Sequence, residues 1–278
     1  MTYKTIRTDT PADHVARITL ARPDRRNAQS IELLYELNAA FDAAARDASI
    51  KVIVLAGDGP HFSSGHDLGG DRTMSGFTPV TPWGGFDAPG AEGRQAREEE
   101  YYLGFCRRWR DIPKPTIAQA HGKTIAGGLM LIAVCDLIVA SQEATFSDPT
   151  VAFGVNGVEW FSHPWDFGPR KAKELLFTGG MLTAAEAHAV GFVNHVVPRD
   201  ELEGFVLSLA GRIAARPAMG LRLAKMAVNQ AQDAQGLQTA VNAAMALHHV
   251  GHAHNQERFG QSIDPAGVDI IRREARGS

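Results

Sequence analysis

Two glycine-rich turns carry the residues whose backbone could do chemistry. The first, at residues 57–68, follows an apolar run that ends at Ala56, and the second, at residues 121–128, follows another apolar run and opens a helix. Glycine lets the backbone turn sharply and lets a ligand approach the N–H groups, and the first N–H groups of a helix have no partner within it. Two such turns facing one point would stabilise negative charge on a carbonyl oxygen. Ordinary strand-to-helix turns are the alternative, because most glycine-rich turns bind nothing.

A carboxylate and an imidazole farther along the chain have the spacing of an acid–base pair. Glu159 and His163 are four residues apart, so a helix would place both side chains on one face. A carboxylate can orient an imidazole and raise its basicity, which suits proton transfer. Pro164 disfavours a regular helix here, and a surface Glu–His pair is the alternative interpretation.

A group of four histidines near the end of the chain comprises His248, His249, His252 and His254. His248 and His252 have the spacing at which two helical side chains can share a metal ion. No cysteine or carboxylate pattern nearby completes a site, so we interpret the group as a solvated helix face and predict no bound metal. The two cysteines, Cys106 and Cys135, lack a nearby catalytic partner and are expected in the core.

The composition excludes several classes of protein. The 278 residues are 44% hydrophobic and 21% charged, and 28 Lys plus Arg against 31 Asp plus Glu give a net charge of −3. A disordered chain would be less hydrophobic, and a near-neutral charge gives no general attraction to nucleic acid or an anionic membrane. The longest apolar stretch, residues 125–135, is shorter than the roughly 20 residues that span a bilayer, and the N-terminus lacks the apolar stretch of a signal peptide. We therefore expect a cytoplasmic protein that binds neither nucleic acid nor membrane.

Apolar periodicity predicts an α/β protein with a helical C-terminal part. Strands are expected at residues 3–8, 14–20, 51–56, 116–120, 136–140 and 193–197. Helices are expected at residues 30–46, 94–110 and 169–177, from Gly127, from Thr183 and after Asp200. Because strands alternate with helices up to residue 197 and only helices follow, we divide the chain into an α/β core at residues 1–200 and a helical region at residues 201–278.

The order of several motifs resembles that of the crotonase, or enoyl-CoA hydratase/isomerase, superfamily. The matching residues, spread over about residues 3–200, are Arg22-Pro23 with Asn27-Ala28, residues 56–62 and 65–68, residues 113–115, Gly122, Gly127-Gly128, Cys135-Asp136, residues 177–179, residues 184–191 and Val193-Asn194. Each motif is weak on its own, and their order and density carry the resemblance.

The resemblance implies a spiral of ββα units, a trimer or hexamer assembled through residues 201–278, and an acyl-CoA thioester as substrate with no further cofactor. In that family two backbone N–H groups hold the thioester oxygen as it becomes an enolate, and motif position places them at His66 and Gly127. The residues that would contact CoA or the acyl group are Arg22, Arg25, Arg26, Ser64, Gly65, Asp67, Leu68, Met130 and Thr150. For the arginines, an ordinary solvated position is the alternative.

The chain departs from the family at the two positions where its hydratases carry glutamates. Met130 and Thr150 stand there, and neither side chain can act as a carboxylate base. Hydration needs a base to activate water and an acid to protonate the α-carbon, whereas double-bond isomerisation needs one group that moves a proton. We therefore predict isomerase-type proton transfer by Glu159 together with His163, and an atypical hydratase remains open.

Loss of both glutamates also allows other functions. A non-catalytic acyl-CoA-binding protein and a CoA-thioester hydrolase are the alternatives. The His66 imidazole could enter the site or be solvated, and the aromatic residues Trp160, Phe161 and Trp165 could line an acyl pocket or pack in the core. Residues 69–93, which are rich in glycine and proline, are expected to cover part of the site.

Overall fold

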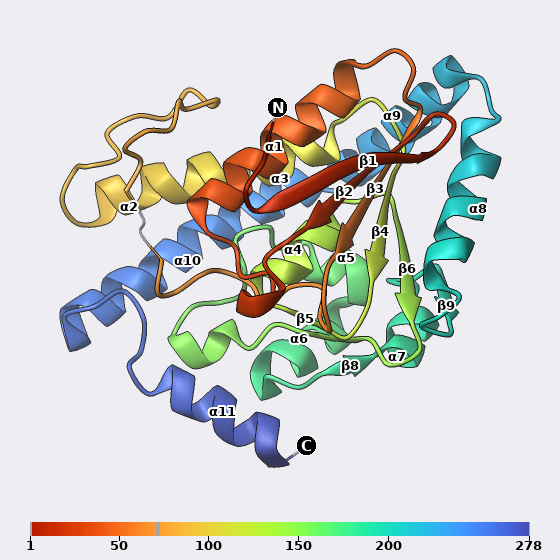
Figure 1. The fold of residues 1–278 in the computed structure, drawn as a ribbon. Helices are drawn as coiled ribbons and strands as arrows, with labels where there is room; N and C mark the ends of the chain where they lie inside the picture. The colour runs from red at the N-terminus through yellow and green to blue at the C-terminus, as the bar shows by residue number, and fades with distance from the viewer. Residues whose placement is uncertain (1, 71–72, 278) are drawn as a thin grey trace.

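A six-stranded sheet forms the frame of the molecule (Figure 1). The computed structural model describes residues 2–70 and 73–277. The strand order is β1-β2-β3-β4-β6-β9, with β1 and β2 antiparallel and every later neighbour parallel. The bounds are β1 (Ile6–Ala12), β2 (Val15–Leu20), β3 (Val52–Gly57), β4 (Thr116–Ala120), β6 (Leu137–Ser141) and β9 (His195–Val197). Both faces of β3 and β4 are buried, which is why their sequences are nearly continuous apolar runs.

A second, three-stranded sheet positions the start of helix α4 (Gly127–Ala133). Its strand β5 (Lys123–Ile125) pairs in parallel with β7 (Thr145–Ser147), and β7 pairs antiparallel with β8 (Leu182–Thr183). None of these three strands was predicted, because strands of two or three residues carry too little pattern to be recognised. Helix α4 begins directly after β5, as the glycine pair at its start predicts.

The other helices cover the sheets and extend beyond them. They are α1 (Ile31–Arg46), α2 (Ala91–Glu98), α3 (Phe105–Arg110), α5 (His163–Phe167), α6 (Pro169–Thr178), α7 (Ala184–Ala189), α8 (Leu202–Ala214), α9 (Ala218–Ala234), α10 (Leu237–Phe259) and α11 (Gly267–Gly277), with short 3₁₀ turns at Pro23–Arg25 and Thr150–Phe153. Thr183 and Glu186 form a capping box at α7. No helix in the described part of the chain is both long and apolar enough to cross a membrane.

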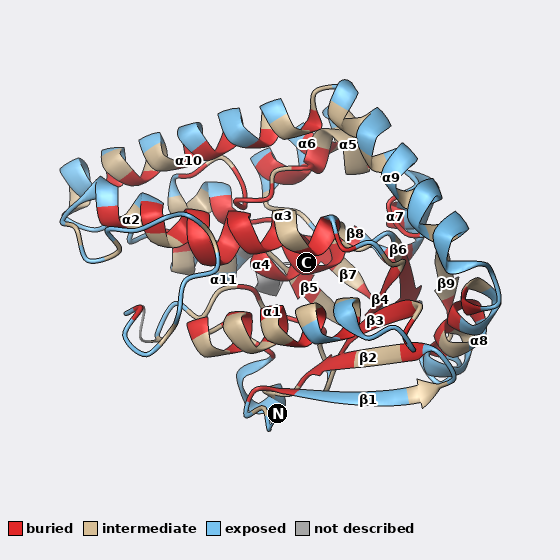
Figure 2. Cartoon of the chain, turned by 90° about the horizontal axis from the view of Figure 1, so that it is seen from above, coloured by how far each residue is buried: buried red, intermediate tan, exposed pale blue. Residues whose placement is uncertain are grey.

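Helices pack on both faces of the main sheet, and its central strands are buried between them (Figure 2). On one face α1 and α3 belong to the larger core through Leu37 and Phe105. On the other face α8 packs through Val206 in one cluster with Val52 and Val54. Helix α8 therefore shares a core with the sheet, although the sequence groups it with the C-terminal helices. The assembly role of residues 201–278 stays a prediction.

The single helix expected at residues 94–110 is divided by a π-helical turn. Helix α2 ends at Glu98, the π turn runs over Glu99–Gly104, and α3 follows without a break. All six residues of the π turn are buried. A π turn inserts an extra residue into a helix and is often found at functional sites, and hydropathy alone does not distinguish it from an α-helix.

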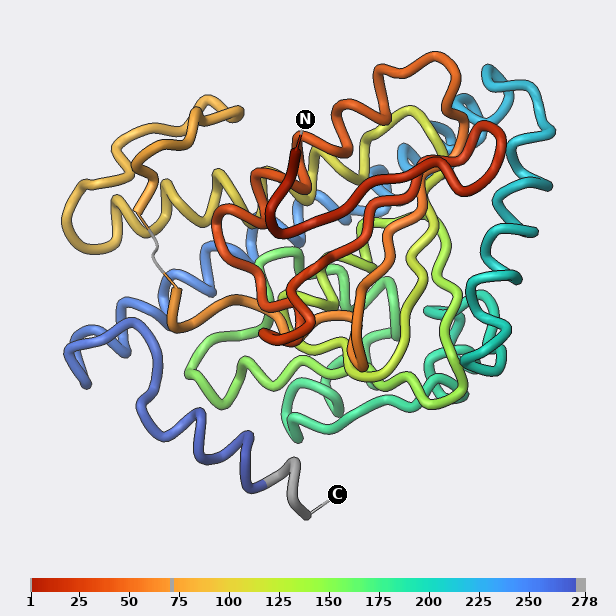
Figure 3. The backbone as a smooth tube through the Cα atoms, viewed as in Figure 1, coloured from red at the N-terminus to blue at the C-terminus, as the bar shows by residue number. Residues whose placement is uncertain are grey.

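The long loop at residues 73–90 projects from the body of the protein beside α1 and α2 (Figure 3). The buried Glu100 carboxylate holds it, because it accepts hydrogen bonds from the backbone N–H groups of Val80 and Thr81 and from the hydroxyl groups of Thr81 and Tyr35. Hydrogen bonds from Val80 and Thr81 thus attach the middle of the loop to the π turn. Its expected role in covering the site stays a prediction.

Asn27 fastens the turn that follows β3. Its side-chain amide donates to the carbonyl oxygens of Asp58, His61 and Phe62 at 2.9 to 3.1 Å and accepts from the N–H of Arg22 at 2.9 Å. Asn27 is fully buried and has a φ of +51°, a conformation that asparagine tolerates better than most residues. This one side chain therefore provides hydrogen-bond partners for three backbone carbonyl groups of the turn that leads to His66.

We expect Asn27→Ala to lower the free energy of unfolding by about 2 to 4 kcal/mol, because it leaves several buried backbone groups without partners. Urea unfolding at a fixed protein concentration measures the change. Gln230→Ala, at an exposed position of α9, is the control and should change stability by less than about 0.5 kcal/mol. A loss for Asn27→Ala as small as that of the control would show that the turn does not depend on this residue.

Candidate active site

The two glycine-bearing turns meet at the start of α4. The N–H of Ile125 donates to the carbonyl of Ser63 at 3.0 Å, which joins the two segments side by side. Gly65 has a φ of +88°, and a Cβ there would lie 3.0 Å from the Gly127 nitrogen, so the approach requires glycine. Within residues 2–70 and 73–277, neither the His66 N–H nor the Gly127 N–H donates a hydrogen bond. Both are therefore free to serve as the predicted oxyanion donors.

Ala126 adopts a strained conformation just before the second of these donors. Its φ of +49° and ψ of −115° lie outside the regions that non-glycine residues favour. Its N–H donates to the carbonyl of Ser147 at 2.9 Å, so the neighbouring strand helps to hold it. Such strain persists only where the surrounding structure enforces it, and here it sets the direction of the chain as Gly127 begins α4.

The imidazole of His66 lies inside the site rather than in solvent. A Cβ at Gly127 would lie 2.6 Å from both Cε1 and Nδ1 of this ring. On another side, Tyr102 from the π turn stacks on the ring with the centroids 3.8 Å apart. The ring is therefore held between the turn at Gly127 and the π turn.

His66 and Glu159 form a buried ion pair. Nε2 of His66 is 3.0 Å from Oε2 of Glu159, and Nδ1 is 3.1 Å from the side-chain oxygen of Gln29. Both ring nitrogens thus face oxygen acceptors, and an imidazole that carries two N–H groups satisfies both. Glu159 is 4% exposed, so its contact with the imidazole is shielded from water and is stronger than it would be at the surface.

The pair controls the protonation of Glu159. Burial alone would raise the pKa of this carboxyl group, but the charge and hydrogen bond of His66 outweigh burial and lower its pKa below the ordinary value. His248 adds a smaller effect in the same direction, with its Nε2 3.7 Å from Oε1 of Glu159. Glu159 is therefore ionised at neutral pH and can accept a proton.

The structure does not bring His163 to Glu159. Glu159 lies in an irregular segment before α5, so the predicted shared helix face does not form. His163 instead contacts Asp148, with Nε2 2.9 Å from Oδ2 but without the direction of a hydrogen bond. Asp148 also accepts from the Thr150 hydroxyl and the Val158 N–H. This second buried pair holds the segment that carries Glu159, and the spacing-based pairing of Glu159 with His163 is wrong.

The sequence and the fold place this chain among known proteins. A family profile described as Enoyl-CoA hydratase/isomerase matches residues 10–79 and 84–264. The chain belongs to the enoyl-CoA hydratase/isomerase family. The crotonase-like α/β fold with its helical C-terminal part, expected from the motif order, is confirmed.

Relatives in this family carry the names of different reactions. The chain is 42% identical over 275 residues to "Putative enoyl-CoA hydratase EchA13" of Mycobacterium tuberculosis (strain ATCC 25618 / H37Rv), which covers 96% of this chain and 86% of that protein. It is 32% identical over 223 residues to "Enoyl-CoA delta isomerase 2" of Homo sapiens, covering 80% of this chain and 53% of that protein. It is also similar to the crystal structure of a "probable enoyl-CoA hydratase" from Mycobacterium smegmatis, with a TM-score of 0.85, 44% identity, and coverage of 95% and 100%.

In this member of the family, the two positions expected to carry hydratase glutamates supply no carboxylate. Met130 is 1% exposed within α4. Thr150 donates its hydroxyl to Asp148 at 2.6 Å, so its proton is already engaged. Glu159 is a carboxylate that contacts His66, whose ring packs against the turn at Gly127.

The residues expected to contact CoA gather in one part of the surface. Arg22 donates to Asp67 at 3.0 Å, and the N–H of Ser64 donates to the carbonyl of Arg26 at 3.0 Å. Arg25 and Arg26 are exposed, as is Leu68. The segment thus offers two exposed cations, while the charge of Arg22 is paired with Asp67. Contact of these residues with CoA stays a proposal.

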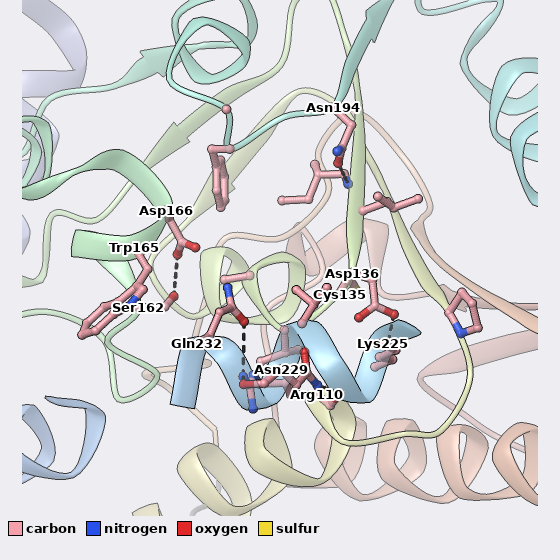
Figure 4. Close-up of a pocket in the computed structure, with 18 of the residues that line it drawn as sticks. Arg110, Cys135, Asp136, Ser162, Trp165, Asp166, Asn194, Lys225, Asn229 and Gln232 are labelled. Carbon is pink, nitrogen blue, oxygen red and sulfur yellow. Dashed lines mark hydrogen bonds and ion pairs between the residues drawn. The ribbon is translucent and has the colours of Figure 1, made fainter. Parts of the chain in front are cut away.

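A cavity of about 590 Å³ lies at the far end of α4, under α9 (Figure 4). Its wall includes the ion pair between Asp136 and Lys225, with 2.9 Å between Oδ2 and Nζ. Trp160 and Trp165 line this cavity, as does the free thiol of Cys135. The donors and the charge pair of the candidate site do not line it, so this hollow is separate from the proposed chemistry.

We expect Gly127→Ala to reduce acyl-CoA turnover by about 100-fold, because the new methyl group would displace the His66 ring, and a shift of about 1 Å in a catalytic group can have such an effect. Steady-state kinetics on an accepted enoyl-CoA measures this. Gly220→Ala, within α9 where a Cβ meets nothing within 4 Å, should keep full turnover and gain slightly in stability. Equal turnover for both variants would contradict the placement of His66 in the site.

Proposed function

We propose that this enzyme shifts the double bond of an enoyl-CoA thioester by proton transfer. Glu159 is the base, the imidazolium of His66 is its charge partner, and the N–H groups of His66 and Gly127 hold the thioester oxygen. The observation that supports this most directly is the 3.0 Å contact between His66 and Glu159 on a ring that packs against Gly127.

The reaction needs one proton carrier and no other reactant. Glu159 takes a proton from the α-carbon of a β,γ-enoyl thioester, and the electron pair of that C–H bond moves toward the thioester oxygen to form a dienolate. The same carboxyl group then returns the proton to the γ-carbon. The double bond moves to the α,β position, and neither water nor an oxidant is consumed.

The position of His66 suits the movement of charge in this step. Before proton transfer the negative charge is on Glu159, and afterwards it is on the thioester oxygen. The His66 ring lies next to both places, since it contacts Glu159 directly and packs against the turn that carries the oxyanion donors. A fixed cation in a buried site therefore stabilises both forms without rearrangement, which is how preorganised electrostatic groups lower a barrier.

Isomerisation fits this site better than hydration. Hydration needs one group to activate water and a second to protonate the α-carbon. The positions expected to carry these groups hold Met130 and Thr150, which leaves one carboxylate in contact with the oxyanion turn. Human enoyl-CoA delta isomerase 2, whose name includes this reaction, adds support. Other relatives are named as enoyl-CoA hydratases. Hydration is therefore the alternative reaction that the experiment must distinguish.

We expect Glu159→Gln to lower kcat for isomerisation of a β,γ-enoyl-CoA by about 10² to 10⁴, the usual effect of losing an acid–base group. The KM should change little, because the amide keeps the shape of the side chain. Glu203→Gln, which removes an exposed carboxylate that pairs with Arg17, is the control and should retain full activity. Unchanged turnover in Glu159→Gln would exclude this residue from the mechanism.

Product analysis separates the proposed reaction from its alternatives. A panel of enoyl-CoA substrates of different chain length and double-bond position, incubated in deuterated water, should give shifted double bonds, with deuterium at carbon only to the extent that the proton on Glu159 exchanges with solvent before its return. A 3-hydroxyacyl product would instead indicate hydration, and released thiol would indicate hydrolysis. Binding without any exchange or product would identify a non-catalytic acyl-CoA-binding protein.

We also propose that the chain assembles with copies of itself through α9. No residue of this helix is buried, and it exposes Met219, Leu223 and Met226, which follow one another at helical spacing. An exposed apolar stripe of this kind indicates an interaction surface. The family resemblance implies a trimer or hexamer, and a second copy of this chain is the partner that a stripe on a C-terminal helix would meet.

We expect the double variant Leu223→Glu, Met226→Glu to shift the protein toward the monomer, because burying two new carboxylates in an interface is unfavourable. Light scattering coupled to size-exclusion chromatography gives the mass of the assembly. Gln142→Glu, which adds a charge at an exposed position outside α9, should leave that mass unchanged. A monomeric wild-type protein, or a double variant with the wild-type mass, would contradict the proposal.

A further inference from the structure

The buried cluster of Glu98, His248 and His252 joins α2 to α10 beside Glu159. One side-chain ligand atom from each residue lies within 4.8 Å of the other two, and all three residues are buried. The two histidines are the pair with helical spacing that the sequence shows, and the expectation that they lie on a solvated helix face is wrong because both are buried. Glu98 is the carboxylate that the sequence could not connect with them, since it is about 150 residues away. The structure therefore supplies the missing member of a possible metal site.

The two imidazoles are already oriented for coordination. His248 directs Nδ1 at the carbonyl oxygen of Gly157 at 2.9 Å, and His252 directs Nδ1 at the carbonyl oxygen of Ser262 at 2.5 Å. A carbonyl only accepts, so each Nδ1 carries a proton, and Nε2 is the atom that binds a metal when the metal displaces its proton. A ring N–H held by a backbone carbonyl is the usual support of a metal-bound histidine.

The carboxylate of Glu98 has two imidazole neighbours, both at long distance, and Nδ1 of His249 lies 3.6 Å from its Oε2. Its Oε2 makes no hydrogen bond within residues 2–70 and 73–277, and Oε1 is 3.4 Å from Nε2 of His252. The charge of Arg94, one turn earlier on α2, also interacts with this carboxylate. A buried carboxylate without a close hydrogen-bonded partner is costly, so this position favours a cation.

The distances favour a metal ion over a shared proton. A charge-assisted N–H···O bond is about 2.7 to 2.9 Å long, which is shorter than the 3.4 Å between His252 and Glu98. Two ligands that each lie about 2.1 Å from a tetrahedral zinc ion are about 3.4 Å apart. The separation of these two atoms is thus that of neighbouring ligands around one ion.

We propose that Glu98, His248 and His252 bind one divalent transition-metal ion, with Zn²⁺ as the ion that suits two imidazoles and a carboxylate. The fourth position would be open to water. The ion would link α10 to α2 just before the π turn. One of its ligands, His248, also has its Nε2 3.7 Å from Oε1 of Glu159. We assign it a positioning role for the π turn and for Glu159.

Metal binding by the whole protein tests this site without any assay of activity. After treatment with a chelator and its removal, we expect wild-type protein to bind one Zn²⁺ per chain in calorimetric titration. With Co²⁺ it should show the visible absorption of a tetrahedral site. Because Zn²⁺ would bind the folded state, added Zn²⁺ should also raise Tm. Absence of saturable binding by wild type would overturn the proposal, whatever the behaviour of the variants.

Variants locate the ion. His252→Gln and Glu98→Gln should each weaken Zn²⁺ binding by roughly 100-fold or more and abolish the rise in Tm, because each removes a direct ligand, and loss of a supporting residue alone already costs up to about 100-fold. His254→Gln, an exposed histidine of the same helix, should bind as wild type does. Equal Zn²⁺ binding by His252→Gln and wild type would place the metal elsewhere and overturn the proposal.

Discussion

The contact between His66 and Glu159 is the interaction on which the rest of the site depends. Burying either charge alone would cost several kcal/mol, and the pair is tolerable only where geometry and further hydrogen bonds compensate. The protein supplies these from separate segments: Gln29 holds the other ring nitrogen, and Tyr102 of the π turn stacks on the ring. Gly127 must remain glycine because the ring occupies the space of its side chain. The turn at Gly127 and the pair of His66 with Glu159 therefore depend on each other, because the same ring contacts both.

In the proposed mechanism, a shared fold supports a different distribution of catalytic groups. The proposed backbone donors depend on strand ends and on the start of a helix, which the fold supplies. The acid–base function, by contrast, depends on side chains that can be relocated. Here Met130 and Thr150 stand at the expected positions, and Glu159 reaches the oxyanion turn through His66.

Features of the fold that depend on local pattern could be predicted from the sequence, and contacts between distant segments could not. The buried strand β3, the helix that begins after Ser30 and the capping box at Thr183 are all local signals. His66 and Glu159 were both recognised as candidates. Their pairing was missed because it joins a strand-end turn to an irregular segment 93 residues away. His163 was wrongly assigned to Glu159, since its four-residue spacing has meaning only in a helix. The π turn could not be predicted because hydropathy does not distinguish it from an α-helix. The contact of Glu98 with the C-terminal histidines could not be predicted because it joins residues far apart in the sequence.

The most direct test of this account is the protonation of the His66 ring. Nitrogen NMR of protein labelled with ¹⁵N-histidine, with the His66 signals assigned through His66→Asn, reports both ring nitrogens at neutral pH. The account predicts a doubly protonated imidazolium in the wild-type protein and a neutral ring in Glu159→Gln, where the opposing charge is gone. A neutral His66 ring in the wild-type protein would contradict the charge pair and, with it, the proposed movement of charge between Glu159 and the thioester oxygen.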